Sequence, residues 1–121
     1  MTARGLILLP LDGSDLAERA APVAAEVARR AGVPLQLLHV HVPLTAEPIY
    51  VEGLPVMDEH MRPVRRAHEE AYMEEALARL THGVNASMAI LDGPVASALA
   101  DHARASGADL IVMTTHGRGG L

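Results

Sequence analysis

The sequence has no cysteine, tryptophan, phenylalanine or lysine, and only two tyrosines among 121 residues. Without cysteine there are no thiol nucleophiles, thiolate metal ligands or disulfides. Without lysine there is no phosphate-loop lysine and no Schiff-base chemistry. The scarcity of aromatic rings argues against the stacking surfaces that bind single-stranded nucleic acids. The core must therefore be built from Leu, Ile, Val, Ala and Met.

Basic residues are outnumbered by acidic residues, ten to fifteen. All ten basic residues are arginine, and the formal net charge is −5. Such a chain has no basic field for nucleic acid or anionic lipid, so neither is expected as a partner. The N-terminal apolar run is too short for a signal sequence or a membrane span. We therefore expect a soluble, cytoplasmic protein with one domain over residues 1–121.

Short apolar segments alternate with segments of helical spacing. The apolar segments are predicted strands: 6–9, 34–42, 84–91 and 108–115, the third near a sheet edge. The segments of helical spacing are predicted helices: 15–31, 62–82 and 95–106. This order predicts an α/β fold, an open parallel sheet with helices on both faces, as in Rossmann-like proteins.

Three local features refine this prediction. Pro22 lies inside the first predicted helix and should kink it. Asp15 and Glu18 have capping-box spacing at the start of that helix. Segment 43–63 carries four prolines and is predicted as a long surface loop.

Two loops follow predicted strands at the carboxyl edge of the sheet, where open α/β sheets bind ligands. The first is Pro10–Ser14, with Asp12 and Gly13, and the second is Thr114–Gly120. The glycines of the second loop would let backbone N–H groups approach a phosphate without help from lysine. A flexible tail explains the same composition equally well. If the first and last strands are neighbours, both loops face one crevice.

Three charged or polar residues of these loops are candidate ligand contacts. Asp12 could accept hydrogen bonds from a ribose or adenine, or face a metal bound to phosphate. An Asx-turn or helix N-cap is the more common use of such an aspartate and is favoured on the residues alone. In the second loop, Arg118 could add a charged fork, and His116 could contact phosphate or position the loop.

Histidines and carboxylates elsewhere give weaker signals. His39 and His41 share one face of a predicted strand, but no third metal ligand has matching spacing. Hydrogen-bonded, partly buried histidines are therefore favoured. The sequence has no paired catalytic carboxylates and no Gly-x-Ser-x-Gly elbow around Ser14, so no catalytic residue is identified. The acidic residues of the second helix are predicted to form a solvated face: Glu69, Glu70, Glu74 and Glu75.

Four segments together resemble the universal stress protein family: Ile7–Ser14, Leu37–Val40, Leu91–Pro94 and Ala108–Leu121. They occur in the order and spacing of that family and span essentially the whole chain. The resemblance implies an adenine-nucleotide α-hydrolase-like fold. It also implies binding of ATP, with Mg²⁺ or Mn²⁺, in a regulatory or stress-tolerance role.

The resemblance also implies roles for individual residues. Pro10, Val40 and Met113 correspond to adenine-pocket positions, and Val40 would contact the base through its backbone. Asp12, which precedes Gly13, corresponds to the ribose contact or to the contact with a phosphate-bound metal. The phosphate loop would begin in the last segment: Thr114, His116, Gly117, Arg118 and Gly119.

The sequence departs from the family pattern at two points. Thr114 replaces the first glycine of Gly-x-x-Gly, although threonine can also hydrogen-bond phosphate. The sequence ends before the motif's final Gly-Ser or Gly-Thr and before the fifth strand, through which family members commonly dimerise. We therefore expect the 121-residue chain to bind nucleotide more weakly than an extended homodimeric form, and to associate differently.

Two other functions stay open. A family branch without the glycine motif works through dimers and protein partners, which Thr114 slightly favours. An ATP-using enzyme of a related fold would need motifs of which Asp12–Asp15 is only a partial match. Slow ATP hydrolysis would be compatible with the nucleotide-binding function.

Overall fold

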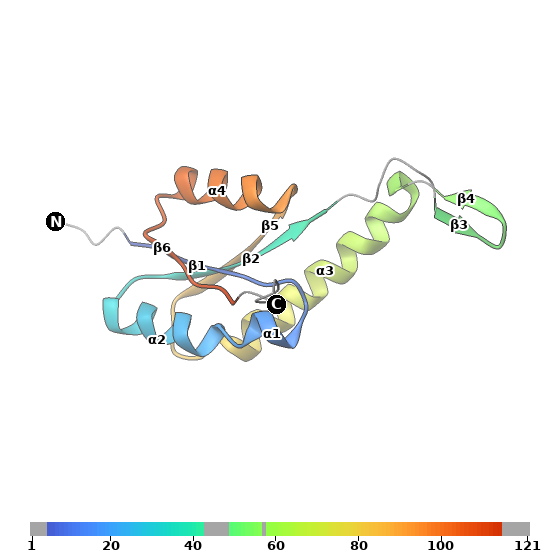
Figure 1. Ribbon diagram of the computed structural model, residues 1–121. Helices are drawn as coiled ribbons and strands as arrows, with labels where there is room; N and C mark the ends of the chain where they lie inside the picture. The colour runs from blue at the N-terminus through green and yellow to red at the C-terminus, as the bar shows by residue number, and fades with distance from the viewer. Residues whose placement is uncertain (1–4, 43–48, 57, 115–121) are drawn as a thin grey trace.

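The structure is a computed structural model, and it describes residues 5–42, 49–56 and 58–114. Its centre is a four-stranded parallel sheet with the strand order β5-β2-β1-β6 (Figure 1). The strands of this sheet are β1 (Ile7–Pro10), β2 (Leu35–His41), β5 (Ala86–Asp92) and β6 (Leu110–Ile111). The helices are α1 (Asp15–Glu18), α2 (Ala21–Ala31), α3 (Asp58–Leu80) and α4 (Val95–Ser106).

The helices form a layer on each face of the sheet (Figure 1). Leu9 and Leu37 belong to the core that packs against α2 and α3, whereas Leu8 and Leu38 pack with Leu99 of α4. Neighbouring residues of β1 and β2 are thus buried on opposite faces, which explains their unbroken apolar runs. The predicted open parallel sheet with helices on both faces is confirmed, and so is the edge position of β5. Within the described residues, no helix has the length and apolar character needed to cross a membrane.

The start of the first predicted helix differs from the prediction. Two helices, α1 and α2, replace one kinked helix, and Pro22 lies in the first turn of α2. Proline is tolerated there because the N–H groups of the first turn have no partner within the helix. The capping-box prediction is also wrong, because the N-cap is Ser14, whose Oγ accepts a 3.1 Å hydrogen bond from the Ala17 N–H.

The predicted loop 43–63 contains regular structure. Strands β3 (Ile49–Val51) and β4 (Leu54–Val56) form an antiparallel hairpin, and α3 begins at Asp58. The hairpin turn residues Glu52 and Gly53 have φ values of 52° and 80°, as a type I′ turn requires. The hairpin and the start of α3 extend away from the sheet (Figure 1). Proline content therefore misled the sequence prediction, because the turn chemistry is carried by Glu52 and Gly53.

Contacts to two distant segments hold the one-turn helix α1. The Glu18 carboxylate accepts hydrogen bonds from the Tyr72 hydroxyl at 2.7 Å and from Arg79 Nη1 at 2.8 Å, both on α3. On the other side, the Thr114 hydroxyl donates a 2.8 Å hydrogen bond to the Leu16 carbonyl. The hydrogen bonds from Arg79 and Tyr72 lower the pKa of Glu18 below its ordinary value. Helix α1 is thus fixed between α3 and the segment after β6.

The Glu18 contacts predict a pH-dependent stability. Because the folded-state pKa of Glu18 lies below 4.5, its stabilisation should be present above that pH and lost as the pH falls further. Urea unfolding at pH 7 should show E18Q less stable than the native chain by about 1–2 kcal/mol. The gap should shrink as the pH falls below 4.5.

A matched control is E26Q, because Glu26 pairs with Arg29 and Arg30 on the exposed surface of α2. Surface pairs of this kind contribute about 0–1 kcal/mol, so E26Q should stay near the native stability. Equal losses for E18Q and E26Q, or a gap that widens in acid, would contradict this account of α1.

Candidate functional site

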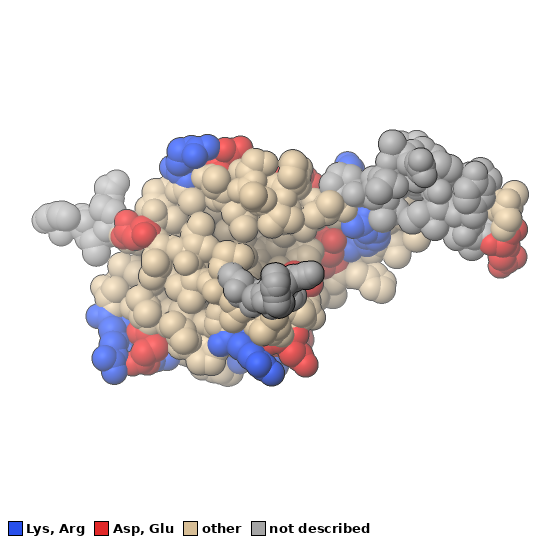
Figure 2. Space-filling view, in the orientation of Figure 1, with Lys and Arg blue, Asp and Glu red and all other residues tan. Residues whose placement is uncertain are grey.

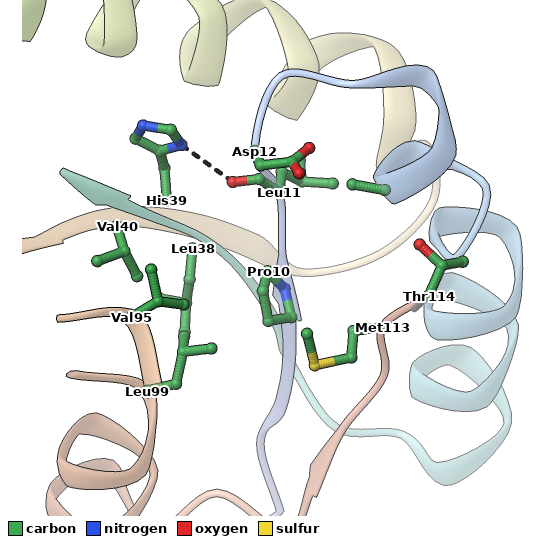
Figure 3. A pocket seen from close by; sticks show the side chains of 11 residues that line it. Pro10, Leu11, Asp12, Leu38, His39, Val40, Val95, Leu99, Met113 and Thr114 are labelled. Carbon is green, nitrogen blue, oxygen red and sulfur yellow. Dashed lines mark hydrogen bonds between the residues drawn. The ribbon is translucent and has the colours of Figure 1, made fainter. Parts of the chain in front are cut away.

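A pocket of about 220 Å³ opens at the carboxyl ends of β1, β2 and β6 (Figure 3). Strands β2 and β5 lie on one side of β1 and β6 lies on the other, so the strand order reverses beside β1. This reversal is the usual ligand-binding point of open α/β sheets. The pocket is lined by residues from five segments: Pro10, Leu11, Asp12, Ala17, Leu38, His39, Val40, Val95, Leu99, Met113 and Thr114.

The condition for a shared crevice is met, because the first and last strands are neighbours. Ile7 pairs with Leu110 and Leu8 with Ile111, so β1 and β6 are parallel neighbours. Their adjacency places Asp12 and Thr114 on the same pocket, one from each strand end. The two loops that the sequence singled out therefore start at one crevice.

The walls of the pocket are largely apolar. Leu38 and Leu99 are buried at its base, whereas Val95 and Met113 are about half exposed at its rim. In Figure 3, Pro10 lies between Val40, Val95 and Leu99 on one side and Met113 on the other. The surface between α4 and α1 is mostly uncharged, and charged side chains gather around its periphery (Figure 2). Such walls suit a flat, uncharged ring rather than a densely charged group.

The backbone of Val40 faces the pocket at the point where the pairing between β1 and β2 ends. The ladder between β1 and β2 reaches the Leu11 N–H, which donates a 2.7 Å hydrogen bond to the Leu38 carbonyl. Among the described residues, no backbone hydrogen bond joins Val40 to the segment that follows β1. The N–H and C=O of one strand residue point to the same side. Val40 therefore presents a donor and an acceptor together beside the pocket.

Asp12 has the local role favoured from sequence and also lines the pocket. Its Oδ1 accepts hydrogen bonds from the Ser14 N–H at 2.9 Å and the Ser14 hydroxyl at 2.6 Å, which is an Asx-turn. Gly13 has a φ of +89°, so the loop needs a residue that tolerates left-handed backbone. Asp12 therefore forms the Asx-turn and lines the pocket at the same time.

Two candidate residues after β6 reach the pocket. Met113 and Thr114 line the pocket, and the Thr114 hydroxyl is used to hold α1. This contact gives the threonine a structural role where the family pattern has glycine. Four predicted phosphate-loop residues lie outside the described residues, and their roles stay predictions: His116, Gly117, Arg118 and Gly119.

His39 lines the pocket, although the sequence alone does not identify it as a ligand-site residue. Its Nδ1 lies 3.0 Å from the Leu11 carbonyl oxygen, and its Nε2 lies 3.3 Å from Glu69 Oε2. Glu69 Oε1 lies 2.8 Å from the Nδ1 of the fully buried His41. The interpretation of both histidines as hydrogen-bonded is confirmed; His39 is partly buried as predicted, whereas His41 is fully buried. The assignment of Glu69 to a solvated face was wrong, since its side chain is 17% exposed.

The contacts among Glu69, His39 and His41 determine the pKa of the Glu69 carboxyl group. Burial raises the pKa of Glu69, but hydrogen bonds from His41 and His39 outweigh it and lower the pKa below the ordinary value. Within the described part of the chain, no group of three or more His, Asp or Glu is arranged to hold a metal ion. The contacts of this cluster connect β2 with α3 and with the pocket loop.

Five apolar lining residues were also missed by sequence reasoning: Leu11, Ala17, Leu38, Val95 and Leu99. Aliphatic side chains at helical or strand spacing carry no chemical signature that separates pocket from core. The available signal was positional, because Val95 opens the helix that follows β5, and strand-end positions are where open sheets bind ligands.

Comparisons with known proteins agree with this architecture. A universal stress protein of Thermus aquaticus is 38% identical over 115 residues, which cover 95% of this chain and 80% of the relative. A universal stress family protein from Burkholderia pseudomallei has a TM-score of 0.75 at 30% identity, with 93% of this chain and 83% of that chain covered. Universal stress protein UspA from Lactobacillus plantarum has a TM-score of 0.73 at 23% identity, with 98% and 83% covered.

Some solved structures with the same fold contain adenine nucleotides. A universal stress protein in complex with cAMP has a TM-score of 0.60 at 22% identity, covering 93% of this chain and 77% of that one. An Arabidopsis thaliana family protein with AMP bound has a TM-score of 0.59 at 18% identity, covering 95% and 79%. At these identities the likeness shows the fold alone.

The family is decided by the sequence match as well as by the fold. The sequence model of the universal stress protein family matches residues 4–121. That match and the Thermus aquaticus relative both extend over nearly all of this sequence. The chain belongs to the universal stress protein family.

Proposed function

We propose that the chain binds an adenine nucleotide, specifically ATP with Mg²⁺ or Mn²⁺ on its phosphates, and acts as a regulatory or stress-tolerance protein. The observation that carries the proposal is the shared pocket of Asp12, Val40 and Met113, assembled by the pairing of β1 with β6. The cAMP and AMP complexes of other family proteins support an adenine nucleotide as the ligand class.

The pocket fits the base end of such a ligand. Pro10, Leu99 and Met113 supply apolar walls for a purine ring, and Val40 supplies a paired backbone donor and acceptor for its edge. Whole-ligand sites commonly measure about 300–1,000 Å³, so a pocket of about 220 Å³ suits the base and the adjoining sugar. The phosphates would then extend beyond Thr114, toward the glycine-rich segment.

A divalent cation would arrive with the phosphates. The described residues hold no ready-made cluster of three metal ligands, so the triphosphate would supply most of the oxygen ligands. Asp12 is the carboxylate of the pocket lining and would contact either the ribose or the cation. The cation would neutralise phosphate charge beside this carboxylate.

The pocket favours holding a ligand over transforming it. The Ser14 hydroxyl donates to Asp12, and the Thr114 hydroxyl donates to a backbone carbonyl. A backbone carbonyl cannot act as a general base for Thr114. Ser14 does not line the pocket, and its contact with Asp12 belongs to the Asx-turn and N-cap, in which Ser14 Oγ also accepts the Ala17 N–H. Homodimer formation remains a prediction of the family resemblance, and a cytoplasmic location remains a prediction from the sequence composition.

Filling the pocket should weaken nucleotide binding. V95W would place a large ring at the pocket rim, where Val95 is 46% exposed, and should weaken ATP binding at least about tenfold by blocking the base. Isothermal titration with ATP and Mg²⁺ measures the affinity directly.

The control for V95W is V23W, which adds the same ring at a 57% exposed position of α2 outside the pocket lining. It should bind ATP as the native chain does. If the native chain gives no binding heat at high protein concentration, the nucleotide proposal fails. The branch of the family that works through protein partners is then the better description.

Replacing the Asp12 carboxylate should weaken Mg-ATP binding by about tenfold. In D12N the amide oxygen can still accept the Ser14 hydrogen bonds, so the Asx-turn is kept while the charge is lost. Titrations with Mg-ATP and with adenosine separate the two contacts. A loss confined to Mg-ATP indicates the cation, and a loss for both ligands indicates the ribose. Unchanged Mg-ATP affinity would remove Asp12 from the site.

A further inference from the structure

We propose that His39 is a positioning residue that keeps the Val40 N–H available for the ligand. Its ring occupies the Leu11 carbonyl, which the sheet would otherwise give to Val40. The part of this inference that concerns ligand affinity rests on the proposed function. The part that concerns the backbone does not.

The register of β1 and β2 identifies the missing rung. Ile7 pairs with Leu35 and donates to the Pro34 carbonyl at 3.0 Å. Four residues on, Leu11 repeats the pattern and donates to the Leu38 carbonyl at 2.7 Å. In a parallel ladder, the partner strand then returns a hydrogen bond to the carbonyl of the same residue.

Val40 would donate that returning bond to Leu11. No such bond is present between these two described residues, and the Leu11 carbonyl oxygen lies 3.0 Å from His39 Nδ1 instead. A carbonyl oxygen only accepts, so His39 Nδ1 carries the proton and donates. The His39 side chain thus donates to the Leu11 carbonyl in place of the Val40 backbone N–H; the His39 hydrogen bond is drawn in Figure 3.

Glu69 lies beside the His39 ring and holds it in this orientation when both ring nitrogens of His39 carry a proton, so that Nε2 also donates. Its Oε2 lies 3.3 Å from His39 Nε2, and its Oε1 is bound by His41 Nδ1 at 2.8 Å. The His39 side chain is only 14% exposed, and the His41 side chain is fully buried. The carboxylate is therefore pinned by two rings on one strand face, and the His39 ring is confined between α3 and the pocket loop.

The released N–H matters for which base is accepted. Val40 offers a donor and an acceptor side by side, which matches a ring edge that carries an acceptor nitrogen beside an amino group. Adenine has such an edge, whereas guanine places a carbonyl oxygen in the position of that amino group. If the rung to Leu11 closed, the donor would be consumed and the preference for adenine would be lost.

The direct test is amide hydrogen exchange in the ligand-free protein. The Val40 amide should exchange at least about tenfold faster than that of Leu38, which lies inside the ladder. In H39L the Leu11 carbonyl is released to Val40, so Val40 exchange should slow by about tenfold or more. ATP titration of H39L should show about tenfold weaker binding.

Two further variants separate positioning from simple loss of structure. Asparagine can place an amide N–H near the position of Nδ1, so H39N should restore both fast Val40 exchange and ATP affinity. H102L removes a comparable side-chain hydrogen bond, from His102 to Gln36 at 2.7 Å, outside the pocket lining. It should leave both readouts as in the native chain.

The outcomes are separable. Val40 protection equal to that of Leu38 in the native chain would overturn the proposal, even if H39L failed to fold. Unchanged Val40 exchange in H39L would also overturn it. Absence of ATP binding by the native chain would overturn the proposed function, while the exchange measurements would still decide whether His39 replaces the rung.

Discussion

The site depends on the position of β1 between β2 and β6. Both faces of β1 are buried, by α2 and α3 on one side and by α4 on the other, so Leu8 and Leu9 are each without solvent exposure. Burial of this kind fixes the register, because a slip of one residue would exchange the two faces. With the register fixed, the ends of three parallel strands must open onto the same space.

The pocket is then shaped by how β1 leaves the sheet. After Pro10 the chain makes one last backbone hydrogen bond to β2, from the Leu11 N–H to the Leu38 carbonyl. It then turns away from β2 into the Asx-turn of Asp12. Side chains hold the divergence open: His39 takes the Leu11 carbonyl, while Glu18 and Thr114 fix the one-turn helix that follows. These side-chain hydrogen bonds therefore keep the chain after β1 apart from β2. Continued backbone pairing of the two strands would close the pocket.

Much of this architecture could be predicted from the sequence. Apolar runs and helical spacing were sufficient for the parallel sheet. The two unusual strand-end loops were sufficient to propose a shared crevice on the condition that β1 and β6 are neighbours, which they are. The break between α1 and α2 could not be predicted, because Pro22 is equally compatible with a kink or a first turn. The β3–β4 hairpin was missed because the prolines of segment 43–63 favoured a loop, whereas its turn is made by Glu52 and Gly53. The Glu69 contact was inaccessible for another reason. Its partner histidines are brought to it only when α3 packs on β2.

The central claim is that an adenine nucleotide occupies the pocket at the ends of β1, β2 and β6. The most direct measurement is an amide NMR titration of the full chain with Mg-ATP. The account predicts the largest shifts at the pocket segments, with Val40, Asp12 and Met113 foremost. Shifts absent from these residues, or concentrated on the β3–β4 hairpin or the solvent face of α2, would contradict it.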